Sequence, residues 1–347
     1  MKKVFIYIYI IIMVVLVIII PFIFAHNVDM ALEQRKGAVE GNGKTEANGG
    51  GTTDTVENIN TLTINVYMTD QKKIVKMRLE DYLIGVVAAE MPASFELEAL
   101  KAQAVAARTY ALGRATGLYG SPEDHKGADI CTDPAHCQAW ISKETAMRRW
   151  GLISSFNNWN KICKAVQETS GQVIEYEGVI INPLFHSNSG GHTENSEDVW
   201  DGTAEPYLRG VASPGEDTFS EYKGEVVMKQ EDMVKKLKEF NPKLVIKNKD
   251  LMSNIKIQKY SSGDRVMSMK IGNVTLKGTD FRTLFKLKST NFKMSKLPDG
   301  RISITTIGYG HGVGMSQCGA DYLAKEGKNY ADILKYYYQG VDLKKVS

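Results

Sequence analysis

The stretch that most constrains the fold runs from Glu80 to Thr116, where two helical patterns meet at a glutamate. In the first pattern, apolar side chains recur at helical spacing, at Tyr82, Leu83, Val86 and Val87. This helix should end at Glu90, because Met91 precedes Pro92 and a residue before proline disfavours helical backbone. A helix pair joined by a short corner is therefore predicted at the centre of the folded domain.

The second helix is expected to begin near Ser94 or Phe95. Its inner face is rich in alanine, which lets another backbone come close, and consists of Leu97, Leu100, Ala104, Ala107 and Ala111. Polar residues at positions i, i+7 and i+11 share a different face of this helix, and they are Gln103, Tyr110 and Arg114.

Glu90 would lie at a helix C-terminus, between alanines and the Met-Pro corner. The negative end of the helix dipole and the apolar neighbours both disfavour the carboxylate, so both raise its pKa. A raised pKa suits a general acid that acts near neutral pH. The same position also fits a solvated glutamate at a helix end, and the residues alone leave both interpretations open.

At the N-terminus, Lys2 and Lys3 precede an uncharged apolar run from Val4 to Ala25 that is long enough to span a bilayer. A cleaved signal peptide is the alternative, because "IFA" resembles a weak cleavage site. The run is long for a signal peptide, so we expect residues 1–25 to be an uncleaved anchor. The preceding lysines would keep the N-terminus in the cytoplasm and leave the rest of the chain outside.

Residues 26–59 are predicted to be a flexible linker, because positions 37–56 are rich in Gly, Asn and Thr and offer almost nothing to bury. The remaining residues, 60–347, should form an α+β domain with two lobes. The larger would comprise residues 60–214 and 301–347. The smaller, at about 215–300, is expected to be an inserted lobe of short strands and frequent lysines. The whole chain carries 43 Lys and Arg against 40 Asp and Glu, and a net charge of +3 does not indicate a nucleic-acid partner.

The segment HKGADICTDPAHC contains four potential metal ligands within 13 residues: His125, Cys131, His136 and Cys137. Two histidines and two cysteines could complete a tetrahedral zinc site, although the spacing is not that of a zinc finger. A disulfide between the two cysteines is a second possibility outside the cytoplasm, and two unrelated thiols are a third. A metal held by four protein ligands would be structural, since no position remains for substrate.

Two further loops combine glycines with polar side chains. In "NPLFHSNSGGHTENSEDVW", two glycines allow a ligand to approach the backbone, and two serines supply hydroxyls. In "GYGHGVGMSQCGA", the glycines alternate, so the pattern of a nucleotide-binding loop is not met. Flexible backbone, polar donors and an aromatic side chain are what a sugar site requires. His186 and His192 are weaker candidates, because a histidine beside a loop is usually polar lining.

The segment "VVAAEMPASFELEALKAQAVAARTYAL" resembles the signature of the stage II sporulation protein D family, which comprises lytic transglycosylases and amidase-enhancer proteins. The two glycine-containing segments agree with the family in the same order, and the resemblance covers most of residues 60–347. It implies that Glu90 is the catalytic acid. Some relatives carry zinc at the matching loop, so the resemblance favours one structural zinc per chain at His125, Cys131, His136 and Cys137.

The resemblance also implies a set of substrate-binding residues on the second helix and the two glycine-containing loops. We expect this set to be Gln103, Arg108, Tyr110, Ser187, Ser189, Gly190, Gly191, Tyr309, His311, Ser316 and Gln317.

The function implied is that of a membrane-anchored lytic transglycosylase, which cuts peptidoglycan between N-acetylmuramic acid and N-acetylglucosamine and leaves 1,6-anhydro ends. The resemblance places this activity in septal wall remodelling and engulfment during endospore formation, on the mother-cell membrane, facing the intermembrane space. Implied partners are glycan strands stripped of stem peptides, the amidase stage II sporulation protein P, and the membrane protein stage II sporulation protein M. A non-catalytic, amidase-enhancing glycan-binding protein and a hydrolase that leaves reducing ends are the alternatives.

Overall fold

The computed structural model describes residues 62–120, 125–200, 202, 204–246 and 250–346. The chain divides into two units, Met1–Thr55 and Val56–Ser347, and every described residue belongs to the second. The expected anchor and linker, residues 1–59, lie outside the described residues. Among the residues that are described, no helix has the length and apolar character needed to cross a membrane.

The folded unit begins with a small sheet that leads into the predicted helix pair. Strands β1 (Thr63–Met68) and β2 (Lys73–Arg78) pair antiparallel, and the short β3 (Ile130–Cys131) joins β1 in parallel. Helix α3 (Leu79–Glu90) follows β2 directly. It ends where the sequence predicts, because Met91 adopts an extended backbone with φ −120° and ψ 143°.

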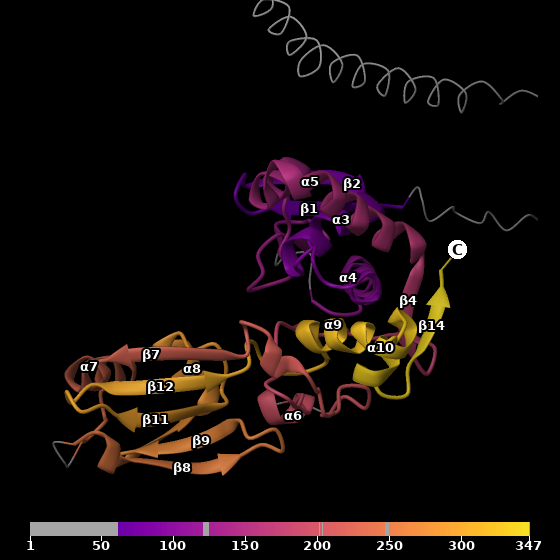
Figure 1. Cartoon of the computed structure of the whole chain (residues 1–347). Coiled ribbons are helices and arrows are strands. Elements are labelled where there is room, and N and C mark those ends of the chain that lie inside the picture. Colours follow the sequence, from indigo (N-terminus) through magenta and orange to yellow (C-terminus); the bar gives the residue numbers. More distant parts are fainter. Residues whose placement is uncertain (1–61, 121–124, 201, 203, 247–249, 347) are drawn as a thin grey trace, which may run out of the picture. The chain divides into compact units, whose positions relative to one another are not determined.

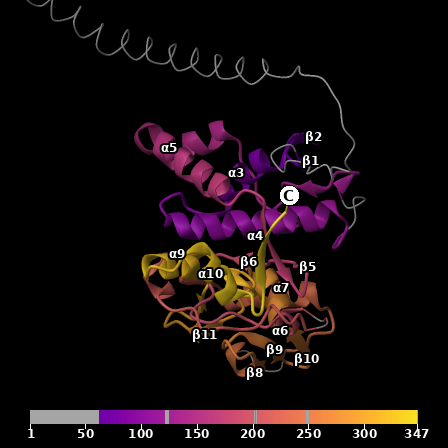
Figure 2. The ribbon, with the colours of Figure 1, turned by 90° about the vertical axis from the view of Figure 1, so that its right-hand side faces the viewer.

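Helix α4 (Leu97–Ala115) begins two residues later than the latest expected start, because Pro92 to Phe95 form a turn in which the Phe95 N–H donates to the Pro92 carbonyl. Its predicted inner face is buried apart from Leu97, which is half-buried. Helix α5 (Lys143–Glu168) packs against α3 and α4 and is broken at Gly151, whose φ of 74° is not helical. Figure 2 shows α4 lying across α9 (Gln317–Lys325) and α10 (Tyr330–Tyr337). These helices share the first hydrophobic core.

Two further small sheets carry the chain around this core. Strands β4 (Gln172–Tyr176) and β5 (Val179–Ile180) form a hairpin, with Glu177 and Gly178 both at positive φ. Strand β14 (Asp342–Lys345) pairs with β4. Strand β6 (Phe185–His186) pairs in parallel with β13 (Met315–Ser316). This last pairing brings together the two glycine-containing loops, which are far apart in sequence.

Residues from 223 to 307 build a second hydrophobic core of their own. It contains two three-stranded antiparallel sheets, seen at the lower left of Figure 1 together with α7 and α8. The elements, in chain order, are β7 (Lys223–Met228), α7 (Gln230–Phe240), η5 (Met252–Asn254), β8 (Ile255–Tyr260), β9 (Val266–Ile271), β10 (Val274–Lys277), α8 (Gly278–Phe285), β11 (Phe292–Lys296) and β12 (Ile302–Ile307). Strand β12, expected in the larger lobe, packs here because it pairs with both β7 and β11.

The α+β class is thus confirmed, with five small sheets among the described residues and no single large one. Two short helical segments complete the described chain, α6 (Ser196–Val199) and η4 (Glu216–Thr218), and both lie between β6 and β7. The division at residues 215 and 300 into two lobes stays a prediction.

Candidate active site and metal centre

Glu90 lines a cleft of about 610 Å³ that is formed by segments distant in sequence. The end of α3 supplies Glu90, α4 supplies Tyr110, and the loop before α5 supplies residues 134–138. The pairing of β6 with β13 adds the opposite walls, Leu184 to Ser187 and Tyr309 to His311, and Gln317 comes from the start of α9. Five predicted substrate-binding residues are therefore brought to the same cleft as Glu90: Tyr110, Ser187, Tyr309, His311 and Gln317.

The Glu90 carboxylate is held by the loop before α5. Its Oε1 accepts a hydrogen bond of 2.7 Å from the Ala139 backbone N–H. Burial raises the pKa of Glu90 above its usual value of 4.5, while hydrogen bonds from Ala139 and Gln317 only partly oppose this. The sequence predicted this direction, and burial is its main cause in the structure. A buried carboxyl with a raised pKa is suited to donate a proton to a bound substrate.

Gln103 supports the cleft from behind. It is fully buried, and its Oε1 accepts a hydrogen bond of 3.3 Å from Nε2 of Gln317, which does line the cleft. Tyr110 is closer to the cavity, where its hydroxyl donates weakly, at 3.4 Å, to the His136 carbonyl. Of the predicted polar face of α4, Tyr110 lines the cleft and Gln103 acts on it through Gln317. Arg114 instead lies against His125, with Nη2 3.0 Å from the ring nitrogens.

Arg108 does not contact the cleft, which corrects the expectation that it binds substrate. Its side chain is fully buried and forms a two-pronged pair with Glu80, with Nε–Oε1 at 2.8 Å and Nη2–Oε2 at 2.7 Å. The same guanidinium donates to the carbonyls of Val166 and Gln172. All its donors are directed at α3, α5 and β4, so its role is to join these elements.

The serine-glycine loop also departs from expectation, because most of its polar groups turn inward to the buried carboxylate of Glu216. Oε2 of Glu216 accepts from the Ser189 hydroxyl at 2.7 Å and from the N–H groups of Gly190 and Gly191 at 2.8 and 3.1 Å. Oε1 accepts from the Ser213 hydroxyl at 2.7 Å. Ser189, Gly190 and Gly191 are thus engaged within the protein and are not among the residues that line the cleft, which differs from the expectation that they contact substrate. Glu216 carried no motif that the sequence could have singled out.

Ser316 likewise has a local task. It is fully buried, and its hydroxyl caps α9 by accepting from the Gly319 N–H at 3.3 Å. This cap places Gln317 at the first turn of the helix, where it reaches the cleft. Gln317 therefore lines the cleft, whereas Ser316 does not.

Sequence reasoning gave little or no weight to His186, which lines the cleft, and to Trp200, whose ring lies beside the cleft residue His311. The Nδ1 of His186 lies 3.1 Å from the Val313 carbonyl and donates to it, whereas Nε2 is buried without a partner. Burial lowers the pKa of His186 well below 6.5, so the ring is neutral and Nε2 is an acceptor. His311 lies between this ring and Trp200, with centroid distances of 5.5 and 5.2 Å, and burial lowers the pKa of His311 to about 3.

Exposed aromatic rings border this part of the cleft. Tyr309 is 45% exposed and Trp200 is 44% exposed, a degree unusual for such large apolar groups. Aromatic faces beside polar donors are suited to a sugar ring. His192, in contrast, directs Nδ1 at the neighbouring Thr193 carbonyl, 2.6 Å away, and is not among the residues that line this cleft.

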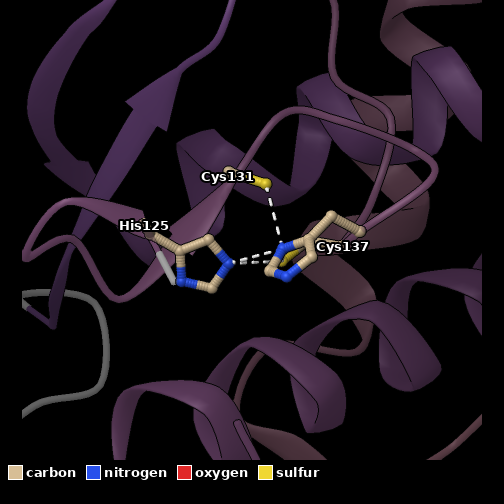
Figure 3. A group of neighbouring side chains, drawn as sticks. His125, Cys131 and Cys137 are labelled. Carbon is tan, nitrogen blue, oxygen red and sulfur yellow. Dashed lines mark hydrogen bonds between the residues drawn. The ribbon is translucent and has the colours of Figure 1, made fainter. Parts of the chain in front are cut away.

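The four predicted metal ligands come together beside the same cleft, and two of them, His136 and Cys137, line it. One ligating atom from each of His125, Cys131, His136 and Cys137 lies within 4.8 Å of all the others. Nε2 of His125 is 2.8 Å from Nδ1 of His136 and 3.1 Å from Sγ of Cys137, and Sγ of Cys131 is 3.6 Å from the same Nδ1. Figure 3 shows the side chains of His125, Cys131 and Cys137 converging on one point.

This donor set fits a tetrahedral zinc ion. With Zn–N bonds of about 2.0 Å and Zn–S bonds of about 2.3 Å, neighbouring ligand atoms should lie about 3.3–3.8 Å apart. The observed separations are close to this range, so small movements would complete the site. Cys131 and Cys137 are both free thiols in the structure. The set would hold zinc through His125, Cys131, His136 and Cys137 and would supply a cross-link between β3 and the loop that carries Ala139.

Comparisons with known proteins identify relatives of this chain. A family model described as "Stage II sporulation protein" matches residues 67–176, which include Glu90 and the metal-ligand loop. The chain is 40% identical to stage II sporulation protein D of Bacillus subtilis (strain 168) over 282 residues, 81% of this chain and 79% of that protein. The same protein of Bacillus amyloliquefaciens is 38% identical, with 81% and 78% covered. An amidase enhancer of B. subtilis is 30% identical over 75% of this chain and 40% of its own length.

Proposed function

The chain belongs to the stage II sporulation protein D family, and on that premise we propose that it is a peptidoglycan lytic transglycosylase. Its substrate would be the glycan strand, cut between N-acetylmuramic acid and N-acetylglucosamine. The observation that carries the proposal is that Glu90 is the only carboxylate among the described residues that line the cleft.

A single carboxylate selects between two ways of cutting a glycan. Glycoside hydrolases normally need two, one as acid and one as base or nucleophile. A transglycosylase needs only one, because the attacking hydroxyl belongs to the substrate. Glu90 would protonate the glycosidic oxygen, and its carboxylate would then remove the proton from the C6 hydroxyl of the muramic acid. That hydroxyl closes on the anomeric carbon and leaves a 1,6-anhydro end.

The other cleft residues would bind and orient the strand. Tyr309 offers an exposed ring face, and Ser187 and Gln317 offer hydrogen-bonding groups in the same cleft as Glu90. The neutral Nε2 of His186 can accept a hydrogen bond from a sugar hydroxyl. Zinc at the four-ligand cluster would be structural, since four protein ligands leave no open position. The loop it braces holds Glu90 through the Ala139 N–H.

We further propose the setting in which this activity operates. An uncleaved N-terminal anchor would hold the domain outside the mother-cell membrane, where it would act in septal wall remodelling and engulfment during endospore formation. The amidase stage II sporulation protein P would strip stem peptides from the strands, and stage II sporulation protein M would be a membrane partner. Motivation for these partners comes from membership of the family.

A second candidate function follows from the similarity to an amidase enhancer. In that case the cleft would bind glycan and stimulate an amidase without cutting the strand, and Glu90 would contribute only polar lining. The two functions make opposite predictions for the products formed by the purified chain.

The test is mass spectrometry of glycan strands, freed of peptides, after incubation with the purified full chain. Anhydro ends support the transglycosylase, reducing ends support a hydrolase, and intact strands support the binding protein. Glu90→Gln should reduce cleavage by about 10²–10⁴-fold, the usual contribution of a general acid. Glu96→Gln, an exposed glutamate six positions away, is the matched control and should cleave at the wild-type rate. Cleavage by Glu90→Gln at the wild-type rate would refute the assignment.

The pH dependence provides an independent test. Glu90 must be protonated to act as the acid, so cleavage should fall as pH rises through its raised pKa. Folding also favours the protonated form. The corresponding contribution to stability is therefore complete below the unfolded-state pKa and is lost as pH rises through the folded-state pKa. Glu90→Gln should remove both dependences, which can be measured by rate–pH profiles and by denaturant unfolding at several pH values.

A further inference from the structure

A second cleft of about 260 Å³ adjoins the first, and His311 lines both. Its walls come from the segment after His192, from β8 to α8, and from His311 itself. None of the expected site residues except His311 reaches it. Its chemistry differs from that of the first cleft, because it contains several cationic side chains together with a deeply buried carboxyl.

At the base of this cleft, burial raises the pKa of the Glu194 carboxyl, and the neighbouring Ser261 hydroxyl and the charge of Arg265 only partly oppose this. Glu194 is only 1% exposed, and no hydrogen bond of normal geometry reaches either carboxylate oxygen. Nε of Arg265, also buried without a hydrogen-bond partner, lies 3.8 Å away, too far for a direct bond. The other nitrogens of Arg265 are engaged with the carbonyls of Gly310 and Ser189. A buried polar group without a partner is costly, so Glu194 needs a donor that these neighbours do not supply.

The rim of the cleft carries cationic side chains that could bind an anion. Arg282 and Lys259 line the cleft, and neither forms an ion pair in the described part of the chain; the Nε of Arg282 donates only to the Leu287 carbonyl, at 3.3 Å. Helix α8 begins at Gly278 beside them, and a helix N-terminus favours an anion. Of the other acidic groups that line the cleft, Glu197 pairs with Arg209, and Asp198 accepts from Asn195. The free cationic groups therefore remain available to a ligand.

We infer that this cleft is a second sugar subsite, which takes a muramic acid unit with a free lactyl carboxylate. The carboxylate would bind Arg282, Lys259 and the start of α8, and hydroxyl or acetamide N–H groups of the sugar would donate to Glu194. A phosphate would satisfy only the cations and would leave Glu194 without donors. A neutral sugar would satisfy only Glu194. A sugar acid supplies both a carboxylate for the cations and hydrogen-bond donors for Glu194.

The inference rests on the proposed function, since it adds a subsite to the same glycan cleft, and it has a consequence for specificity. A stem peptide joined to the lactyl group turns the carboxylate into a neutral amide and adds bulk. The second cleft should therefore favour strands from which the peptides have been removed. Because His311 lines both clefts, a strand with one unit near Glu90 would extend past His311 into this subsite.

The test measures binding by calorimetry, with the full chain in detergent and the Glu90→Gln substitution to prevent cleavage. The probes are a peptide-free tetrasaccharide of alternating N-acetylglucosamine and muramic acid, and an N-acetylglucosamine tetramer without carboxylates. We expect the acidic tetrasaccharide to bind about 10-fold more tightly, the usual effect of one charge-assisted hydrogen bond. Adding Arg282→Gln should lower the affinity for the acidic tetrasaccharide to nearly that for the neutral tetramer. The affinity for the neutral tetramer should not change.

Lys256→Gln, on the same strand as Lys259 but outside the cleft, is the matched control and should retain the preference. If Arg282→Gln does not fold, the exposed Lys259→Gln tests the same contact. Cleavage or binding of glycan with no preference for the acidic probe, or a preference that survives both substitutions, would overturn the subsite and leave the proposed function standing. Failure to bind either probe would overturn both.

Discussion

The metal-ligand loop, residues 125–139, and the serine-glycine loop, residues 187–191, satisfy their polar groups in different ways in the structure. Both contain several polar groups, and both were expected to bind a ligand. In the first, the ligating atoms of two histidines and two cysteines converge on one another. In the second, a serine hydroxyl and two backbone N–H groups converge on a carboxylate supplied by the protein, that of Glu216.

The two loops differ in whether the protein itself supplies partners for their polar groups. One carboxylate of Glu216 accepts four hydrogen bonds, from donors that would otherwise be buried without partners. In the metal-ligand loop, imidazole nitrogens and thiols lie 2.8–3.6 Å from one another. They stabilise one another little, because none of them is a charged acceptor like the Glu216 carboxylate. They gain most from a cation placed between them. A polar loop therefore indicates a ligand only where the rest of the protein does not supply partners for its polar groups.

The largest expected effect tests the inward-facing loop. Glu216→Ala should lower the free energy of unfolding by about 3–5 kcal/mol, because it leaves buried donors without their charged acceptor. Denaturant unfolding measures the change. Asp217→Ala, at the exposed neighbouring position, is the control and should change stability by less than about 0.5 kcal/mol. Equal effects from the two substitutions would show that the Glu216 carboxylate does not hold the loop.

The next effect tests the metal-ligand loop. Protein purified without added metal should contain about one zinc per chain, the number expected of one tetrahedral site. At free zinc about 100 times the Kd, binding should add about 2.7 kcal/mol to stability, and a chelator should remove it. His136→Ala and His125→Ala should each weaken zinc binding, which distinguishes a metal from a disulfide that needs only Cys131 and Cys137. A metal-free, fully active protein with those cysteines joined would refute the zinc site.

Acid provides a second way to separate the two loops. Thiolate and neutral imidazole ligands compete with protons, so zinc should be released as pH falls. The Glu216 loop has no metal to lose and should not respond to a chelator. Zinc release, followed with a colorimetric indicator, should precede global unfolding, followed by circular dichroism. Coincident transitions with and without chelator would indicate that no metal braces the loop.

The smallest effect compares two serines of one motif. Ser189→Ala removes a donor to Glu216 and should cost about 1–2 kcal/mol of stability. Ser187→Ala removes a hydroxyl that lines the cleft and should change stability by about 0.5 kcal/mol or less while weakening glycan binding. Ser189→Ala should therefore lose more stability than Ser187→Ala, whereas Ser187→Ala should lose more affinity for glycan. Denaturant unfolding and glycan binding, measured on both variants, test this. If Ser189→Ala weakens binding more than Ser187→Ala at equal stability, then Ser189 contacts the substrate after all.

Much of the helix pair and of the metal cluster could be predicted, because their signals lie close together in the chain. The end of α3 follows from Met91 and Pro92, and the four cluster residues fall within 13 positions. Glu216 could not be found in this way, because it lies 27 positions from the Ser189 hydroxyl that it accepts from. Trp200 stood within a quoted motif, but only its place beside His311 gives it a role at the cleft.

The sequence by itself determined where α3 ends and which side chains could bind a proton or a metal. These properties depend on a residue's type and its immediate neighbours. Only the tertiary structure decided which of those side chains remain available to a ligand. Arg108 pairs with Glu80, 28 positions away, and Arg265 donates to the Ser189 carbonyl, 76 positions away. Whether a polar group is satisfied depends on partners that folding brings near, and no local pattern records them.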